Sequence, residues 1–167
     1  MDTLMPESLN FDLVLASPVG PLGLVLRGER VRRLCFLPAG TPSKEPSTAQ
    51  ALEVARQLGA YFQDPAQPLA LPLDLGGTPF QQRVWDLLRG IPAGQTLTYG
   101  EAAALLGSGP RAVGGACRAN PCPLLVPCHR IVGARGPGGF AGARHGAWLA
   151  IKSWLLEHEA GANRPRP

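Results

Sequence analysis

The sequence predicts an α+β protein in which a strand-rich first half precedes a helical second half. Between residues 9 and 36, apolar side chains alternate with polar or small ones, as they do in half-buried strands. From residue 78 onward, apolar side chains recur at helical spacing instead. A Gly76-Gly77 pair separates the two patterns, so we expect domains at residues 1–77 and 78–160, followed by a tail at 161–167.

The first half should contain three short strands and one helix. A turn rich in Pro and Gly interrupts the alternation at residues 17–21. Apolar positions between residues 49 and 62 form a helical stripe, and the alternating leucines of residues 69–75 predict a further strand or an extended linker. The expected strands are residues 9–15, 22–26 and 31–36.

Two capping boxes mark helices in the second half. Thr78 precedes Pro79 and has Gln81 as its capping partner, and Thr98 has Glu101 three positions later. The helices that follow these threonines should end near residues 90 and 107, and further helices are expected at residues 111–118 and 147–158. Two short helices joined by a Gly-containing turn are typical of a helix-turn-helix.

Composition and charge narrow the class of protein. Hydrophobic residues make up 45% of the 167 residues, which is a globular composition. No apolar run approaches the roughly 20 residues of a membrane span, and the N-terminus does not resemble a secretory signal, so we expect a cytoplasmic protein. Residues 1–78 carry 6 basic and 8 acidic side chains, whereas residues 79–167 carry 10 and 4. The basic second half indicates a polyanionic partner or a solvated basic face.

The helix expected at residues 111–118 has an unusually bare surface. Gly114 and Gly115 lie inside it, where each costs about 1 kcal/mol relative to Ala. Either another helix packs closely against this stripe, or the stripe enters the minor groove of a nucleic acid, where a bare surface permits close contact with any sequence. The neighbouring side chains of the stripe are Arg111, Ala112, Ala116 and Arg118.

One of the four cysteines has the surroundings of a nucleophile. Cys35, Cys117, Cys122 and Cys128 form no C-x-x-C pair, which is poor zinc spacing. Cys128 follows a proline-rich apolar stretch and precedes His129 and Arg130, and cationic neighbours favour a thiolate. The alternative is a small buried hydrophobe. Adjacent side chains point apart in a strand, so His129 would reach Cys128 through a water molecule.

The residues around Cys128 resemble those of a known protein family. Pro127-Cys128-His129-Arg130 followed by Ile131-Val132 is similar to the active-site signature of the O6-alkylguanine-DNA alkyltransferases, which move an alkyl group from guanine onto their own cysteine. Further blocks in family order are Phe80–Trp85, Ile91–Gly100, Arg111–Gly114, Asn120-Pro121 and Leu155–Glu159. The resemblance covers residues 78–159, and Ser17–Leu22 is similar but less specific.

The resemblance implies a ribonuclease-H-like N-terminal domain and a helical C-terminal domain with a winged or helix-turn-helix element. It also implies single-use repair: O6-alkylguanine, and in some cases O4-alkylthymine, is flipped out of double-stranded DNA from the minor-groove side. Its alkyl group then moves irreversibly to the protein. No cofactor and no metal are expected, and the protein should act as a monomer.

The family's site residues carry over by position. Cys128 would be the nucleophile, with His129 and Glu159 as its deprotonating relay and Asn120 holding the turn before the Cys segment. Tyr99 would help eject and hold the base, and Arg111 would fill the gap that the base leaves. Other DNA contacts would come from Ala112, Gly114, Gly115 and Arg118, and the base would be bordered by Ile131, Phe140, Ala141 and Lys152.

The sequence departs from the family pattern in three places, and three other functions are alternatives to alkyl transfer. The stretch 143–148 is longer than expected, so the role of Lys152 depends on anchoring the alignment at Leu155 and Glu159. Ala141 stands where some relatives carry a hydroxyl, and the first half lacks the Cys and His residues that hold a structural zinc in some relatives. The rivals are a helix-turn-helix regulator, a damage sensor without transfer, and a Cys-His hydrolase.

Overall fold

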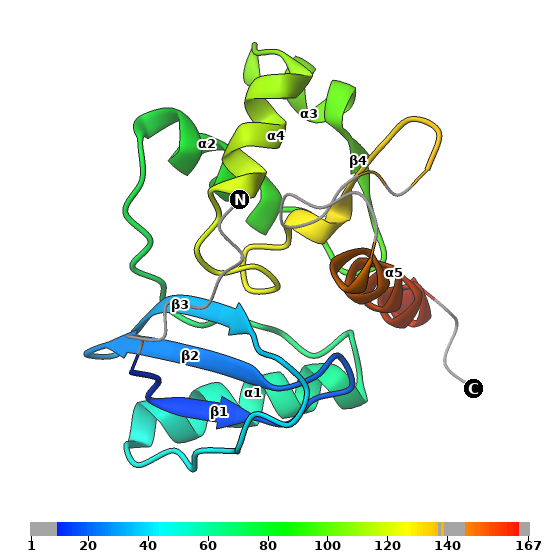
Figure 1. The fold of residues 1–167 in the computed structure, drawn as a ribbon. Helices are drawn as coiled ribbons and strands as arrows, with labels where there is room; N and C mark the ends of the chain where they lie inside the picture. The colour runs from blue at the N-terminus through cyan, green and yellow to red at the C-terminus, as the bar shows by residue number, and fades with distance from the viewer. Residues whose placement is uncertain (1–9, 137, 139–145, 164–167) are drawn as a thin grey trace. The chain divides into compact units, whose positions relative to one another are not determined.

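The computed structural model describes residues 10–136, 138 and 146–163 (Figure 1). The chain divides into two compact units, which adjoin in sequence between Leu75 and Gly76. Within the described part of the chain, no helix is both long enough and apolar enough to cross a membrane.

The N-terminal unit contains a three-stranded antiparallel sheet and one helix. The strands β1 (Leu13–Leu15), β2 (Leu22–Arg27) and β3 (Arg30–Phe36) are adjacent in the order β1-β2-β3, and α1 spans Ala49–Gln63. The regular part of β1 begins later than the alternation suggested. At Asp12 the backbone N still donates to the carbonyl of Leu24 at 2.8 Å, and the side chain accepts from the backbone N of Leu26 at 2.7 Å.

The sheet and α1 enclose the core of this unit. Cross-strand pairs join Leu22 to Phe36 and Leu24 to Leu34, and all four side chains are buried. The helix contributes Ala51, Val54, Leu58 and Tyr61 to its buried face. The leucine alternation of residues 69–75 yields an extended segment with a single parallel bridge between Leu73 and Val31. Prolines at 68 and 72 lack the N–H groups that a longer ladder would need.

The C-terminal unit is helical, as the sequence predicts. Both capping boxes form: Thr78 caps the first helix with Gln81 in return, and Thr98 caps the second with Glu101. Its elements are α2 (Pro79–Arg89), β4 (Leu97–Thr98), α3 (Tyr99–Leu106), α4 (Pro110–Arg118), the 3-10 helix η1 (Cys128–Arg130), β5 (Ile131–Val132), α5 (Ala147–Ala160) and the 3-10 helix η2 (Gly161–Asn163).

A few long-range contacts fix the Cys segment relative to the helices. The two-residue strands β4 and β5 pair in parallel, with Leu97 opposite Ile131 and Thr98 opposite Val132. Since Tyr99 follows β4 directly, this pairing places the start of α3 beside the chain that follows Cys128. The buried indole of Trp85 in α2 donates to the carbonyl of Ala116 at 2.9 Å and thereby joins α2 to α4.

Candidate active site

Cys128 lies at the start of η1, at the end of a tightly braced loop. Its backbone N donates to Val126 O at 2.7 Å, and its side chain is 5% exposed. The side chain of Asn120 braces this loop because its Nδ2 donates to Val126 O and its Oδ1 accepts from the backbone N of Cys122, each at 2.9 Å. The expected role of Asn120 as a loop holder therefore has a matching geometry.

The backbone around Cys128 differs from the strand considered above. Cys128, His129 and Arg130 form a single 3-10 turn, and the strand begins only at Ile131. In such a turn the three side chains fan out around the axis instead of alternating between two faces. The turn directs His129 and Arg130 to the same carboxylate, as described next.

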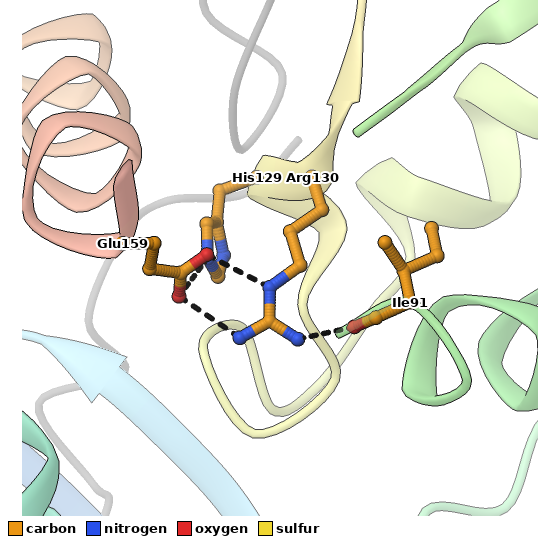
Figure 2. Close-up of polar contacts among 4 residues, drawn as sticks. All are labelled: Ile91, His129, Arg130 and Glu159. Atoms are coloured by element: carbon orange, nitrogen blue, oxygen red, sulfur yellow. Dashed lines mark hydrogen bonds and ion pairs between the residues drawn. The ribbon is translucent and has the colours of Figure 1, made fainter. Parts of the chain in front are cut away.

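Glu159 of α5 is the centre of a buried ionic cluster (Figure 2). His129 Nε2 lies 2.8 Å from Glu159 Oε2, and Arg130 donates from Nε and from a terminal nitrogen to the two carboxylate oxygens at 2.8 and 2.9 Å. A second terminal nitrogen of Arg130 donates to the carbonyl of Ile91. The cluster thus joins η1, α5 and the segment after α2.

The protonation states in this cluster follow from burial and charge. Burial alone would raise the pKa of Glu159, but hydrogen bonds from His129 and Arg130 and the charge of Arg130 outweigh it and hold that pKa well below its usual range. Burial lowers the pKa of His129, so its imidazole is neutral at neutral pH. An ionised Glu159 can only accept, so neutral His129 donates from Nε2, and its Nδ1 carries a lone pair. That Nδ1 is buried and has no hydrogen-bond partner among the described residues.

The thiol of Cys128 is not a thiolate at rest. Burial raises its pKa to about 11, although a hydrogen bond with Asn120 and the charge of Lys152 act in the opposite direction. At pH 7 only about one molecule in 10,000 would then carry a thiolate, since each pKa unit is a factor of ten. The sequence suggested that His129 and Arg130 would supply positive charge beside the thiol, but the imidazole of His129 is neutral and Arg130 pairs with Glu159. The positive charge that acts on the thiol is that of Lys152, and burial outweighs it.

Lys152 of α5 is fully buried near the thiol. Its Nζ donates to the carbonyl of Ile131 at 2.7 Å. Burial lowers its pKa to about 8, while Cys128 and Cys117 act in the opposite direction. The chain therefore brings Lys152 into the neighbourhood of Cys128 despite the long stretch that precedes α5.

Tyr99 lies between two glycines. One edge of its ring is 3.9 Å from where a Cβ on Gly114 would lie, and the other edge is 3.1 Å from the corresponding position on Gly138. Burial raises the pKa of the Tyr99 hydroxyl to about 12, and the thiols of Cys117 and Cys128 act in the same direction, so the hydroxyl keeps its proton.

The bare stripe of α4 is an open surface. A Cβ on Gly115 would meet no described atom within 4 Å, so no helix packs closely there. Val113 and Ala116 supply the buried side of the helix instead. The exposed residues of α4 are Pro110, Arg111, Ala112, Gly115 and Arg118, with Gly114 half-buried. Of the two explanations for the stripe, close helix packing is therefore excluded at Gly115.

The structure brings most of the expected site residues together. Cys128, His129 and Glu159 lie close to Asn120, Ile131 and Lys152 through the contacts given above. Phe140 and Ala141 lie outside the described residues. Sequence reasoning missed the bidentate grip of Arg130 on Glu159 and the role of the Ile91 carbonyl, and no sequence signal marks a main-chain acceptor. Within the described ranges, no three His, Cys, Asp or Glu side chains gather as a metal site.

Comparison with known proteins gives a consistent result. The family model described as "6-O-methylguanine DNA methyltransferase, DNA binding domain" matches residues 79–161. The methylated-DNA–protein-cysteine methyltransferase of Mycobacterium leprae is 43% identical over 149 residues, covering 86% of this chain and 88% of that relative. The constitutive enzyme of Bacillus subtilis is 36% identical, covering 90% and 96%.

Solved structures agree with these relatives. The O6-methylguanine methyltransferase of Mycobacterium tuberculosis matches with a TM-score of 0.76 and 37% identity, covering 92% of this chain and 94% of that one. The same enzyme in complex with DNA matches with a TM-score of 0.71 and 37% identity, covering 88% and 91%. The family model, the curated relatives and the solved structures therefore agree that this chain belongs to the O6-methylguanine-DNA methyltransferase family, the methylated-DNA–protein-cysteine methyltransferases that repair O6-methylguanine in DNA.

Proposed function

We propose that Cys128 receives the alkyl group of O6-alkylguanine in double-stranded DNA and keeps it. The observation that carries this proposal is the pairing of a buried thiol with a neutral, buried His129 whose Nε2 is held by Glu159 and whose Nδ1 lone pair has no described partner. Such an imidazole is a general base oriented by a carboxylate.

Proton removal and alkyl transfer would be coupled. The pKa of about 11 makes the resting thiol a poor nucleophile. The Cys128 proton would pass through a water molecule to His129 Nδ1 as the sulfur attacks the alkyl carbon. A C–S bond forms, the bond between the alkyl carbon and O6 breaks, and its electron pair stays on the guanine. The protonated Tyr99 hydroxyl would donate toward the departing base, and the Lys152 ammonium would favour the developing anion.

The product explains why each molecule would act once. Hydrolysis of the S-alkyl cysteine would require the thiolate to leave the alkyl carbon. The thiolate is a poor leaving group in a neutral thioether, so the thiol is not regenerated. Ile131 would border the base, and Phe140 and Ala141 are proposed to do so from outside the described residues.

We also propose that α3 and α4 form a helix-turn-helix that places α4 in the minor groove. Its exposed face combines bare backbone with Arg111 and Arg118. The arginines suit contact with phosphates, and the bare backbone suits close contact with the minor groove that does not depend on base sequence. A base in a duplex must be flipped out before chemistry at O6, which costs a few kcal/mol. Arg111, in the first turn of α4, would enter the gap and offset part of that cost. The M. tuberculosis enzyme solved with DNA supports DNA as the partner.

We also propose a structural class for the N-terminal domain. Three antiparallel strands followed by α1, with a parallel bridge from Leu73 to Val31 of β3, support a ribonuclease-H-like N-terminal domain. A monomer located in the cytoplasm, with domain limits at residues 77 and 160, completes the proposal.

One assay tests this function. The protein is incubated with excess duplex that contains O6-methylguanine with an isotopically labelled methyl group. We expect one label per protein molecule, located by peptide mass spectrometry on the fragment that contains Cys128. Cys128→Ser should abolish transfer and keep DNA binding, and Cys35→Ser, in the other unit, should transfer normally. Repeated turnover, or label on Cys117 or Cys122, would overturn the proposal.

A further inference from the structure

The register of the N-terminal sheet sorts its side chains onto two faces. Residues that are directly opposite in neighbouring strands lie on the same face. The pairs Leu22–Phe36, Leu24–Leu34 and Leu26–Val31 therefore share the face that holds the buried core. The alternate pairs Gly23–Cys35, Val25–Arg33 and Arg27–Arg30 share the other face, which we call the second face. Phe11 and Leu37 cover this face at Gly23, and it is exposed only at its arginines.

A bulge concentrates arginine at the exposed end of this second face. Between Val25–Arg33 and Leu26–Val31 the register shifts, which leaves Arg32 without a counterpart in β2. The extra residue keeps Arg33 and Arg30 on one face although they are three apart, because an added residue inverts the alternation. Arg27, Arg30, Arg32 and Arg33 are all exposed.

The contacts of these four side chains leave two guanidinium groups available. Arg27 is 3.7 Å from the Asp74 carboxylate in an exposed pair, and Arg30 donates to the carbonyl of Leu73 at 3.3 Å. Arg32 and Arg33 make no hydrogen bond or ion pair to any other residue that the structure describes. Three carboxylates lie close to this cluster: Glu29 in the hairpin turn, Asp74, and Asp12, which accepts from the backbone N of Leu26. The four arginine charges outnumber these three.

We propose that the arginines of the β2–β3 hairpin form a second DNA-contacting surface, which binds phosphates of the DNA backbone. The proposal rests on the DNA binding proposed above, and it adds a contact from the N-terminal unit. Guanidinium groups match phosphate in geometry and stay charged at all working pH values. Backbone contacts of this kind carry no sequence preference, as a protein that repairs a lesion in any sequence requires.

The test is the salt dependence of DNA binding by the full chain. Affinity for a long undamaged duplex is measured between about 50 and 200 mM salt, where each phosphate contact adds about 0.9 to the slope of log K against log salt. The double variant Arg32→Ala, Arg33→Ala should reduce that slope by about 1 to 2. The matched control is Arg56→Ala, an exposed arginine of α1 in the same unit that is paired with Glu53 at 2.6 Å. It should leave the slope unchanged.

Two outcomes separate this proposal from the proposed function. If the wild-type protein transfers no methyl group, the function fails whatever the slopes are. If transfer is normal and the double variant keeps the slope of the control, the second surface is disproved, and the hairpin is a solvated face or an acidic-protein contact. Repeating the measurement with Arg32→Gln, Arg33→Gln, which removes the charge but keeps more of each side chain than alanine does, guards against a folding defect in the alanine pair.

Discussion

The guanidinium of Arg130 grips both carboxylate oxygens of Glu159, at 2.8 and 2.9 Å, although the two residues are 29 positions apart in the chain. Both are largely removed from solvent, and His129 shares the same carboxylate. The relay proposed for Cys128 is therefore also a structural junction between η1 and α5. A substitution in this cluster should therefore change the free energy of unfolding as well as the rate of transfer.

Glu159→Gln should destabilise the fold by about 3–5 kcal/mol, because it leaves Arg130 as a buried charge without its partner. Since the folded-state pKa of Glu159 is lowered, its contribution is fully present above the unfolded pKa of about 4.3 and is lost as the pH falls below that value. Thermal unfolding measured from pH 3 to pH 7 should show a steeper loss of stability for wild type than for the variant. Parallel curves would mean that Glu159 is not the titrating group.

Lys152→Met should stabilise the protein and reduce methyl transfer. A lysine with a folded-state pKa of about 8 and an unfolded value of about 10.4 disfavours folding below pH 8, and stability should rise between these two values as the ammonium deprotonates. The methionine variant should lack that rise and melt higher at pH 7. A variant that melts lower would show that the hydrogen bond to Ile131 outweighs the cost of burial.

Gly138→Ala should displace Tyr99 and slow transfer. The new Cβ would lie 3.0 Å from Gly133 N and 3.1 Å from the Tyr99 ring, at a residue whose φ is +73°. We expect a stability loss of roughly 1 kcal/mol from the backbone alone and a larger loss in transfer rate. Gly136→Ala is the matched control, because a Cβ there meets no atom of the described residues within 4 Å and its φ is not positive. Equal rates for the two variants would contradict the role of Tyr99.

Gly115→Ala should raise stability and weaken DNA binding. A Cβ at this exposed position of α4 meets no described atom, so the helix gains up to about 1 kcal/mol. The added methyl group would keep the backbone of α4 from the groove. Gly59→Ala in α1, also open to solvent, should give a similar rise in unfolding temperature with no change in affinity for DNA. If Gly115→Ala binds DNA as wild type does, α4 does not face the groove.

Arg111→Ala should slow repair in duplex DNA more than it weakens non-specific binding, because the side chain is proposed to fill the gap left by the flipped base. Reaction with the free base O6-benzylguanine needs no extrusion and should proceed at the wild-type rate. Single-turnover rates on both substrates provide the measurement. The same degree of slowing on both would assign Arg111 to the chemistry or to the fold.

The helix starts of the C-terminal unit are an example of what the sequence predicts well. Thr78 with Gln81 and Thr98 with Glu101 form the expected reciprocal caps. A cap joins atoms only three residues apart, so its free energy depends little on the rest of the fold. The Cys segment was less predictable, because the 3-10 turn at Cys128 depends on Asn120, which holds the preceding loop from inside the fold.

The sequence by itself determined the two-part α+β organisation, the main helix boundaries, the family and the identity of the cysteine to be tested. Periodicity, caps and motifs are local patterns, because each depends on residues that are only a few positions apart in the sequence. Only the tertiary structure decided that the pKa of Cys128 is raised, that Arg130 and His129 share Glu159, and that the face of α4 at Gly115 is open. Burial and long-range contacts set these properties. Desolvation and charge act through space, and only folding brings together residues that are far apart in the sequence.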